Sequence, residues 1–301
     1  MSFFIGVDGG GTKTRAVLVD REGHELGRAV ADGAVATARD PSAAARAVAR
    51  AVRDAVEAAG LELPGAVLWA GLAGAGPREA REGVKKALTR LRLADQVHVG
   101  TDVEAAFHDA FPQGPGVLLI AGTGSIAWTR LADGVTHRVG GWGQHIGDEG
   151  SGFALGVAGL RLVTQAADGR AGETRLSVDL VDACGVSSAE DLIAWVGGAD
   201  KGQVAALAPV VVAAADAGDV GAEAIVARAV EALVAHVAAA GTLLAGERPD
   251  VVLWGGLVAD GGPLRGRVTA ALQGAGWGVE GRTLDPVRGA AHLALESRSR
   301  G

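Results

Sequence analysis

Ile5-Gly6-Val7-Asp8-Gly9-Gly10-Gly11-Thr12-Lys13-Thr14 is the stretch that decides the fold, because it returns in altered form as Leu119-Ile120-Ala121-Gly122-Thr123-Gly124-Ser125. Each copy has an apolar run, a glycine-rich turn with a hydroxyl residue, and a second apolar run that ends in a turn with Asp and Gly. This order is typical of a β-hairpin with a glycine-rich tip. Two such hairpins predict two similar half-domains with one cleft between them.

The glycine-rich tips are expected to bind phosphate. Glycine enters positive φ at no steric cost and leaves no Cβ between the backbone N–H groups and an incoming anion. The first tip is not a Walker A loop, because Thr12 stands where that loop has its Lys and a strand follows instead of a helix. A plain tight turn is the alternative for one hairpin, and the repetition favours two phosphate loops.

Composition excludes several classes of function. The chain has 301 residues, 49% of them hydrophobic, which suits two globular domains. A formal net charge of −7 argues against a nucleic-acid or membrane-surface partner, since both need clustered basic residues. Cys184 is the only cysteine, so one chain cannot build a disulfide, a cysteine-based zinc site or an iron–sulfur cluster.

The expected location is the cytoplasm. The first motif begins at residue 5, which leaves no room for a signal peptide in this sequence. The longest apolar tracts are interrupted by Pro209 or by Arg228, Glu231 and His236, so none is predicted to span a bilayer. A single cysteine fits a reducing compartment.

The rest of the chain repeats the order β-β-β-α-β-α-β-α. In the first half the pattern predicts strands over 5–9, 15–19, 25–31, 66–72 and 96–100, and helices over 41–59, 77–91 and 103–111. In the second half it predicts a hairpin over 117–133, strands over 135–139, 251–257 and 279–284, and helices over 263–272 and 286–297. This is the order of the duplicated α/β actin-like ATPase fold, which is ribonuclease H-like, with two domains around a nucleotide cleft.

The domain boundary is predicted at the Pro-Gln-Gly-Pro-Gly segment, residues 112–116, which has linker composition. The N-terminal domain then covers 1–113 and the C-terminal domain 114–301, with a helical insertion over about 160–249. The last helix has the option of packing back on the first domain. Within the insertion, Val226, Val230, Leu233 and Val237 form an apolar stripe at helical spacing, which fits either core packing or the face of a homodimer.

Four segments together resemble the N-acetylglucosamine kinases of the BadF/BadG/BcrA/BcrD-type ATPase family. They are Asp8 to Thr14, Thr101 to Ala106, Gly122 to Ser125 and the Gly140-Gly141-Trp142-Gly143-Gln144-His145-Ile146-Gly147-Asp148-Glu149-Gly150-Ser151-Gly152 stretch. The last of these is the most specific. The resemblance covers nearly the whole chain and implies a kinase that uses ATP and Mg²⁺ to phosphorylate a small sugar, at the 6-hydroxyl in these relatives.

The resemblance also implies roles for individual residues. It assigns the phosphates to Gly9, Gly10, Gly11, Thr12, Lys13, Thr14, Gly122, Thr123, Gly124 and Ser125, the adenosine to Gly255 and Gly256, and a hydrated Mg²⁺ to Asp8. We expect the sugar to contact Asp102, Thr123, Gly140, Gly141, Trp142 and Asp148. Asp148 and Glu149 both lie in the glycine-rich turn, and the resemblance favours Asp148 because it matches the sugar-binding acid of the family. For Lys13 a solvated hairpin lysine is the alternative, and for Trp142 a buried structural tryptophan.

Asp102 would be the general base. Phosphoryl transfer needs the acceptor hydroxyl aimed at the γ-phosphorus, and a carboxylate that orients this hydroxyl and takes its proton late is sufficient. Asp102 stands where a predicted strand gives way to a helix, and the helix N-terminus is expected to keep it ionised. Helix capping is the alternative role, and it is the preferred one for Asp285, which precedes Pro286 at the equivalent place in the second repeat.

The identity of the sugar stays open at this level. Kinases of the animal type have an Asn after the third strand and another after the second phosphate loop, whereas this chain has Gly33-Ala34-Val35 and Ile126 there. Glucosamine, N-acetylmuramic acid and plain hexoses therefore remain alternatives to N-acetylglucosamine.

Two other classes of function remain to be weighed. An ATPase that activates a dehydratase needs at least two cysteines per chain for its shared cluster, which Cys184 alone does not supply. A nucleotide-dependent assembly or sensor protein has no use for the polar, glycine-lined turn around Asp148.

Overall fold

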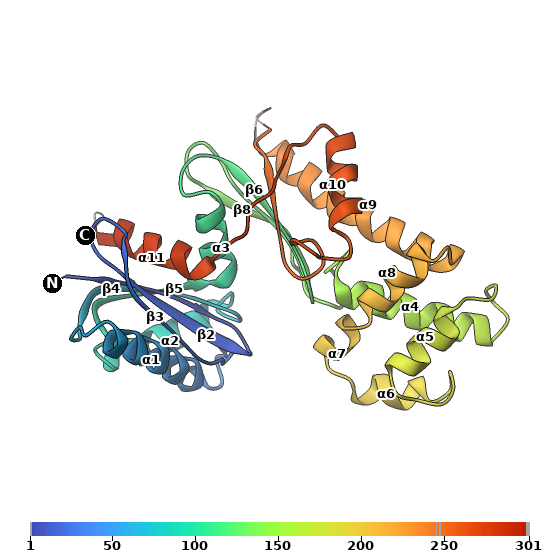
Figure 1. Cartoon of the computed structure of the whole chain (residues 1–301), viewed down its shortest axis with the longest axis horizontal. Coiled ribbons are helices and arrows are strands. Elements are labelled where there is room, and N and C mark those ends of the chain that lie inside the picture. The colour runs from blue at the N-terminus through green and yellow to red at the C-terminus, as the bar shows by residue number, and fades with distance from the viewer. Residues whose placement is uncertain (1, 245, 247, 299–301) are drawn as a thin grey trace. The chain divides into compact units, whose positions relative to one another are not determined.

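The computed structural model describes residues 2–244, 246 and 248–298 (Figure 1). The described residues form two compact units, one made of the chain up to Gln113 together with the segment from Leu284 onward, and the other of Gly114–Thr283. The last helix thus belongs to the first unit, as in the packing-back option, and not to a second domain that runs to residue 301.

The first unit is a five-stranded sheet covered by helices on both faces. Its strands are β1 (Phe4–Gly9), β2 (Lys13–Val19), β3 (Glu25–Asp32), β4 (Gly65–Leu72) and β5 (Ala94–Thr101), in the order β3-β2-β1-β4-β5. Its helices are α1 (Pro41–Ala58), α2 (Arg78–Arg90), α3 (Asp102–Ala110) and α11 (Pro286–Ser297). The strands β1, β2 and β3 pair antiparallel, and β4 and β5 continue the sheet in parallel.

Alternation along the strands gives each face its own core. On one face, Ile5, Val7 and Leu18 pack with α1 and α2. On the other face, Phe4 and Val17 pack with α3 and α11. The predicted start of α1 is confirmed, because the Asp40 side chain accepts hydrogen bonds from the first turn and Pro41 is the first helical residue.

The second unit repeats this sheet. Its strands are β6 (Gly116–Ala121), β7 (Ser125–Arg130), β8 (Thr136–Gly140), β9 (Val251–Trp254) and β10 (Val279–Glu280), in the order β10-β9-β6-β7-β8. Its helices are α4 (Gly152–Ala167), α5 (Leu176–Ala183), α6 (Leu192–Gly198), α7 (Lys201–Ala205), α8 (Ala208–Asp216), α9 (Val220–Thr242) and α10 (Arg265–Gly274). The strand order and directions match those of the first unit, which confirms the predicted duplicated α/β fold.

The helix that covers the second sheet is α9, and it takes the place that α1 has in the first unit, since it packs on β6, β7 and β8. The inserted helices are therefore α4 to α8, and the predicted insertion over about 160–249 wrongly included the sheet helix. In the apolar stripe of α9, Val226, Leu233 and Val237 are fully buried, which confirms core packing. The helix α9 is long and apolar enough to cross a membrane, but here it is a core helix of this unit.

Helix α11 packs very closely on β1, and Gly6 makes this possible. A Cβ at Gly6 would lie 2.3 Å from the backbone nitrogen of Ala291 and 2.5 Å from the carbonyl oxygen of Val287. Since both neighbours are backbone atoms of α11, neither can move aside without displacing the helix.

Substitution of Gly6 by Ala is expected to lower the stability of the fold by about 2 kcal/mol or more, because the added methyl group overpacks the contact between β1 and α11. Gly76→Ala is the matched control, since a Cβ there meets nothing within 4 Å. Thermal unfolding of the two variants and the wild type measures the difference. Equal stability of the Gly6 and Gly76 variants would contradict the close packing of α11.

Candidate active site

The first glycine loop is held by backbone hydrogen bonds at the tip of the β1–β2 hairpin. The N–H of Gly10 donates to the carbonyl oxygen of Lys13 at 2.9 Å, and the N–H of Gly33 donates to that of Thr12 at 3.2 Å. In the described chain, Gly9, Gly10 and Gly11 do not adopt positive φ, so this part of the expectation is wrong.

The space around each glycine of the first loop, rather than its φ angle, shows why a glycine stands there. A Cβ on Gly9 would lie 2.6 Å from the Leu72 side chain, so that position serves packing. A Cβ on Gly10 would have only ordinary contact, at 3.9 Å from the Lys13 oxygen. The protein itself does not require a glycine at residue 10, and the open space suits the close approach of a ligand to the backbone.

The second loop has the same character. The N–H of Gly122 donates to the carbonyl oxygen of Gly124 at 2.9 Å, which closes the tip between β6 and β7. A Cβ on Gly122 would meet nothing nearer than the nitrogen of Gly256, at 3.6 Å, and a Cβ on Gly256 would meet nothing within 4 Å. Gly255 differs, because it has a φ of +103° and its Cβ would lie 2.5 Å from the oxygen of Ala121.

The hydroxyl residues of the two loops divide into exposed and buried ones. Thr12 and Thr123 are exposed. Thr14 and Ser125 are buried, and the Ser125 hydroxyl donates to the carbonyl oxygen of Glu149 at 2.6 Å. The hydroxyls of Thr14 and Ser125 are therefore shielded from solvent, and that of Ser125 stabilises its loop.

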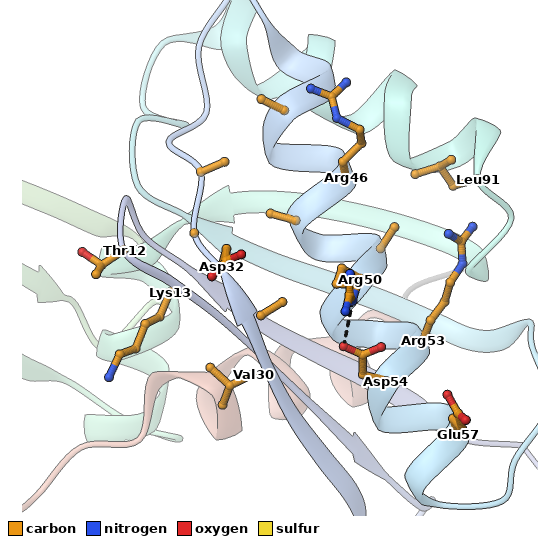
Figure 2. Close-up of a pocket in the computed structure, with 16 residues that line it drawn as sticks. Thr12, Lys13, Val30, Asp32, Arg46, Arg50, Arg53, Asp54, Glu57 and Leu91 are labelled. Carbon is orange, nitrogen blue, oxygen red and sulfur yellow. Dashed lines mark hydrogen bonds and ion pairs between the residues drawn. The ribbon is translucent and has the colours of Figure 1, made fainter.

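Lys13 is exposed, and its amine points away from helix α1 (Figure 2). Beside it, an open groove of about 1100 Å³ runs between the end of β3 and α1. Arg46, Arg50 and Arg53 line this groove together with carboxylates, and Arg50 donates to Asp54 at 3.2 Å (Figure 2). The outer side of the first glycine loop is thus open to solvent.

Asp102 is the first residue of α3, but it does not cap this helix. The cap is Thr101, whose side chain accepts from the N–H of Glu104 at 3.1 Å, while the Glu104 carboxylate accepts from the N–H of Thr101 at 2.7 Å. This reciprocal pair is a complete capping box. The Asp102 carboxylate is therefore available for another role.

Burial dominates the electrostatics of Asp102. Desolvation raises the pKa of this carboxyl above its ordinary value of 3.8, and the neighbouring Asp8 raises it further. The N–H groups at the start of α3, that of Val103 foremost, lower the pKa but do not reverse the shift. We expected the helix N-terminus to keep Asp102 ionised, but burial raises its pKa by more than the helix N–H groups lower it.

Asp8 lies near the end of β1 and is held by Arg15 on β2. Its Oδ2 accepts from the Arg15 guanidinium at 2.6 and 3.2 Å, and burial still raises the pKa of the carboxyl. The same guanidinium lies 3.7 Å from Asp285, whose other oxygen accepts from Arg28 at 2.9 Å. Asp285 occupies the cap position of α11 but makes no side-chain cap bond, so the capping role preferred for it is wrong.

Asp148 is nearly inaccessible, with 4% of the residue exposed. It has a φ of +58°, its Oδ2 accepts from the Lys201 amine at 2.7 Å, and its Oδ1 lies 3.4 Å from the N–H of Ser125. A Cβ on Gly124 would lie 3.1 Å from the same carboxylate. Asp148 therefore supports the second glycine loop directly.

The turn between β8 and α4 presents Trp142 to solvent. This residue is 64% exposed, and the Arg138 guanidinium lies over its ring at 4.7 Å, which excludes a buried structural role. Gly140 and Gly141 have φ values of +73° and +67°, and a Cβ on Gly140 would collide with the His236 ring.

A family model described as the BadF/BadG/BcrA/BcrD ATPase family matches residues 5–294 of this sequence. The chain belongs to this family. The matched range includes both sheets, both glycine loops and all of the candidate residues described above.

Individual proteins that are similar to this chain agree with the family assignment. The chain is 29% identical over 256 residues, 84% of each sequence, to an N-acetylmuramic acid/N-acetylglucosamine kinase of Clostridium acetobutylicum. It is 33% identical over 204 residues, 64% of this chain and 63% of the relative, to an N-acetyl-D-glucosamine kinase of Dictyostelium discoideum. The crystal structure of a candidate N-acetylglucosamine kinase from Chromobacterium violaceum superposes with a TM-score of 0.81 at 30% identity, covering 98% of this chain and 99% of that one.

Four residues that support the site were not assigned from the sequence, namely Thr101, Glu104, Arg15 and Lys201. The Thr101-x-x-Glu104 pair has the spacing of a capping box and could have been found. Arg15 lies on the strand after the first loop and carries no motif of its own. Lys201 is 53 positions from Asp148, so only the structure brings the two together.

Asp102→Asn is expected to stabilise the fold at neutral pH, because an amide does not carry the desolvated charge. Since the folded pKa of Asp102 is raised, the wild type loses stability relative to this variant as the pH rises through that pKa, and the gap closes toward the ordinary value of 3.8. Thermal unfolding from pH 7 down to pH 4 measures the gap. Thr101→Ala is the control for capping and should cost about 1 kcal/mol. A less stable Asn variant at pH 7 would return Asp102 to a capping role.

Proposed function

We propose that this chain is an ATP-dependent kinase that phosphorylates an amino sugar, N-acetylglucosamine first among the candidates, at its 6-hydroxyl. The observation that carries the proposal is the half-buried Asp102 carboxylate, which Thr101 and Glu104 release from capping and which lies within electrostatic range of Asp8. A carboxylate of this kind suits a positioned base beside a metal-bound phosphate.

Asp102 orients the sugar hydroxyl and accepts its proton as the bond to the γ-phosphorus forms. The raised pKa of Asp102 brings it closer to the working pH, which makes the carboxylate a better proton acceptor. Because phosphoryl transfer needs positioning more than covalent assistance, one such base is sufficient.

ATP and Mg²⁺ are the implied cofactors, and the residues present fit them. The open space at Gly10, Gly122 and Gly256 would admit phosphates and adenosine close to the backbone. Asp8 would hold the hydrated Mg²⁺, and its raised pKa reports a buried carboxylate that a cation would stabilise. The metal would supply positive charge to the phosphates.

The sugar would lie against Gly140, Gly141 and Trp142, with Thr123 and Asp148 near it. The exposed Trp142 ring suits the apolar face of a sugar, and the backbone groups of the two glycines suit its hydroxyls. In this role the Asp148 carboxylate would accept hydrogen bonds from both the sugar and the Lys201 amine. Glucosamine and N-acetylmuramic acid remain alternative acceptors.

The expected partners are the small-molecule sugar and nucleotide, and the expected place of action is the cytoplasm. The net charge of −7 and the single cysteine support this assignment. A homodimer is compatible with it and is not required by the chemistry.

Asp102→Asn is expected to bind ATP normally and to lose about a hundredfold or more in kcat, the usual scale for a positioned base. Steady-state ADP release and a separate nucleotide-binding titration check the two halves of this statement. Asp95→Asn, an exposed residue at the start of β5, serves as the matched control. Near-normal turnover of the Asp102 variant would remove it as the base.

The acceptor is identified by ADP release from Mg·ATP with N-acetylglucosamine, glucosamine, N-acetylmuramic acid, N-acetylmannosamine and glucose, beside a control without sugar. One amino sugar is expected to give rapid turnover over slow sugar-independent hydrolysis, because sugar binding completes the site. If no sugar exceeds the control, the kinase proposal fails and a nucleotide-dependent sensor or ATPase takes its place.

A further inference from the structure

The inserted helices of the second unit line a groove that shares one residue, Lys201, with the site described above. It has a volume of about 550 Å³ and lies between α4, α6 and the start of α7. Its walls are mainly apolar, formed by Phe153, Val157, Leu160, Leu192, Ile193 and Val196. Ile193 is 78% exposed and Val196 is 46% exposed, so the α6 wall of the groove presents apolar side chains to water.

The charged residues of the groove are all of one sign. Arg161 and Lys201 line it, and among the lining residues in the described chain there is no carboxylate. This is unusual for a protein with a net charge of −7, and it differs from the groove beside α1, where carboxylates accompany the arginines. An apolar groove with two cations is complementary to a ligand that has an apolar body and one anionic group.

Lys201 connects this groove to the candidate active site. Its amine donates to Asp148 at 2.7 Å, and 35% of its side chain remains exposed. An ammonium group has three N–H donors, so Asp148 leaves donors for a second anion. Asp148 in turn lies against Gly124 and Ser125 of the second glycine loop.

We propose that the groove between α4 and α6 binds a small amphipathic carboxylate, such as a medium-chain fatty acid, with its anionic group at Lys201 and Arg161. The carboxylate of the ligand draws the Lys201 amine toward the groove and weakens its bond to Asp148. The Asp148 carboxylate, less neutralised by Lys201, then becomes a stronger acceptor for a sugar hydroxyl, so the ligand lowers the KM for the sugar. This last step rests on the proposed kinase function, whereas the binding step does not.

Binding is tested by calorimetry with sodium octanoate, and with octan-1-ol as the uncharged ligand of the same chain length. Octanoate is expected to bind about tenfold more tightly than octanol, because only the carboxylate forms charge-assisted hydrogen bonds. Ile193→Asp, which places a carboxylate in the apolar wall, should abolish binding, and Arg161→Glu should weaken it about fivefold or more.

The matched controls are Val178→Asp, an exposed apolar residue on α5, and Arg170→Glu, an exposed cation after α4, neither of which lines the groove. Both should bind octanoate as the wild type does. Equal binding of octanol and octanoate, or binding that survives Ile193→Asp, overturns the proposal. Light scattering that shows a dimer dissociated by Ile193→Asp also overturns it, because the groove would then be an interface between two copies.

The coupling is tested by the KM for the sugar with and without octanoate. The wild type should show a decrease of about fivefold, and Lys201→Met should show none. Since this variant leaves Asp148 without its cation, Lys201→Arg is measured as well and should restore the response. An unchanged or increased KM in the wild type overturns the coupling. If no sugar is phosphorylated but octanoate binds as described, the proposed function fails and the groove assignment stands.

Discussion

The main physical constraint on the candidate site is the burial of two carboxylates, those of Asp8 and Asp102, away from water. Asp8 and Asp102 are both half-buried, burial is the largest cause of the raised pKa of each carboxyl, and the charge of Asp8 raises the pKa of Asp102 further. Only one guanidinium, that of Arg15, directly contacts Asp8 in the described chain. A site with excess buried negative charge is stabilised by a cation, which is the electrostatic requirement for handling a magnesium nucleotide.

Most of the fold could be predicted because its two halves carry the same local patterns. The two hairpins, the start of α1 at Pro41 and the buried strand β4 follow from short-range preferences that tertiary structure does not override. The limits of the insertion could not be predicted. The helices α4 and α9 are both apolar, and periodicity does not say which one covers the sheet. That choice depends on the contacts of α9 with β6, β7 and β8.

The sequence predicts which residues form the candidate site better than it predicts the role of each residue. The sequence placed glycines at both loops, but it assigned them to positive φ, whereas Gly10 and Gly122 are explained by open space. It treated Thr14 and Ser125 as ligands, although the burial of a hydroxyl depends on residues far along the chain. The pair Asp148–Lys201 joins positions that no local pattern relates, so its existence requires the folded insertion.

The two repeats place Asp102 and Asp285 at equivalent positions, but the two side chains have different contacts. Asp102 and Asp285 each precede or begin the last helix of a repeat, at the carboxyl side of a strand. Thr101 and Glu104 form the capping box of α3, so Asp102 is not the side-chain cap of this helix, although its carboxylate still accepts from the N–H of Val103. Asp285 instead accepts from Arg28 and lies beside Arg15. In the first unit one carboxylate thus remains available for chemistry, while the other orders the arginine that holds Asp8.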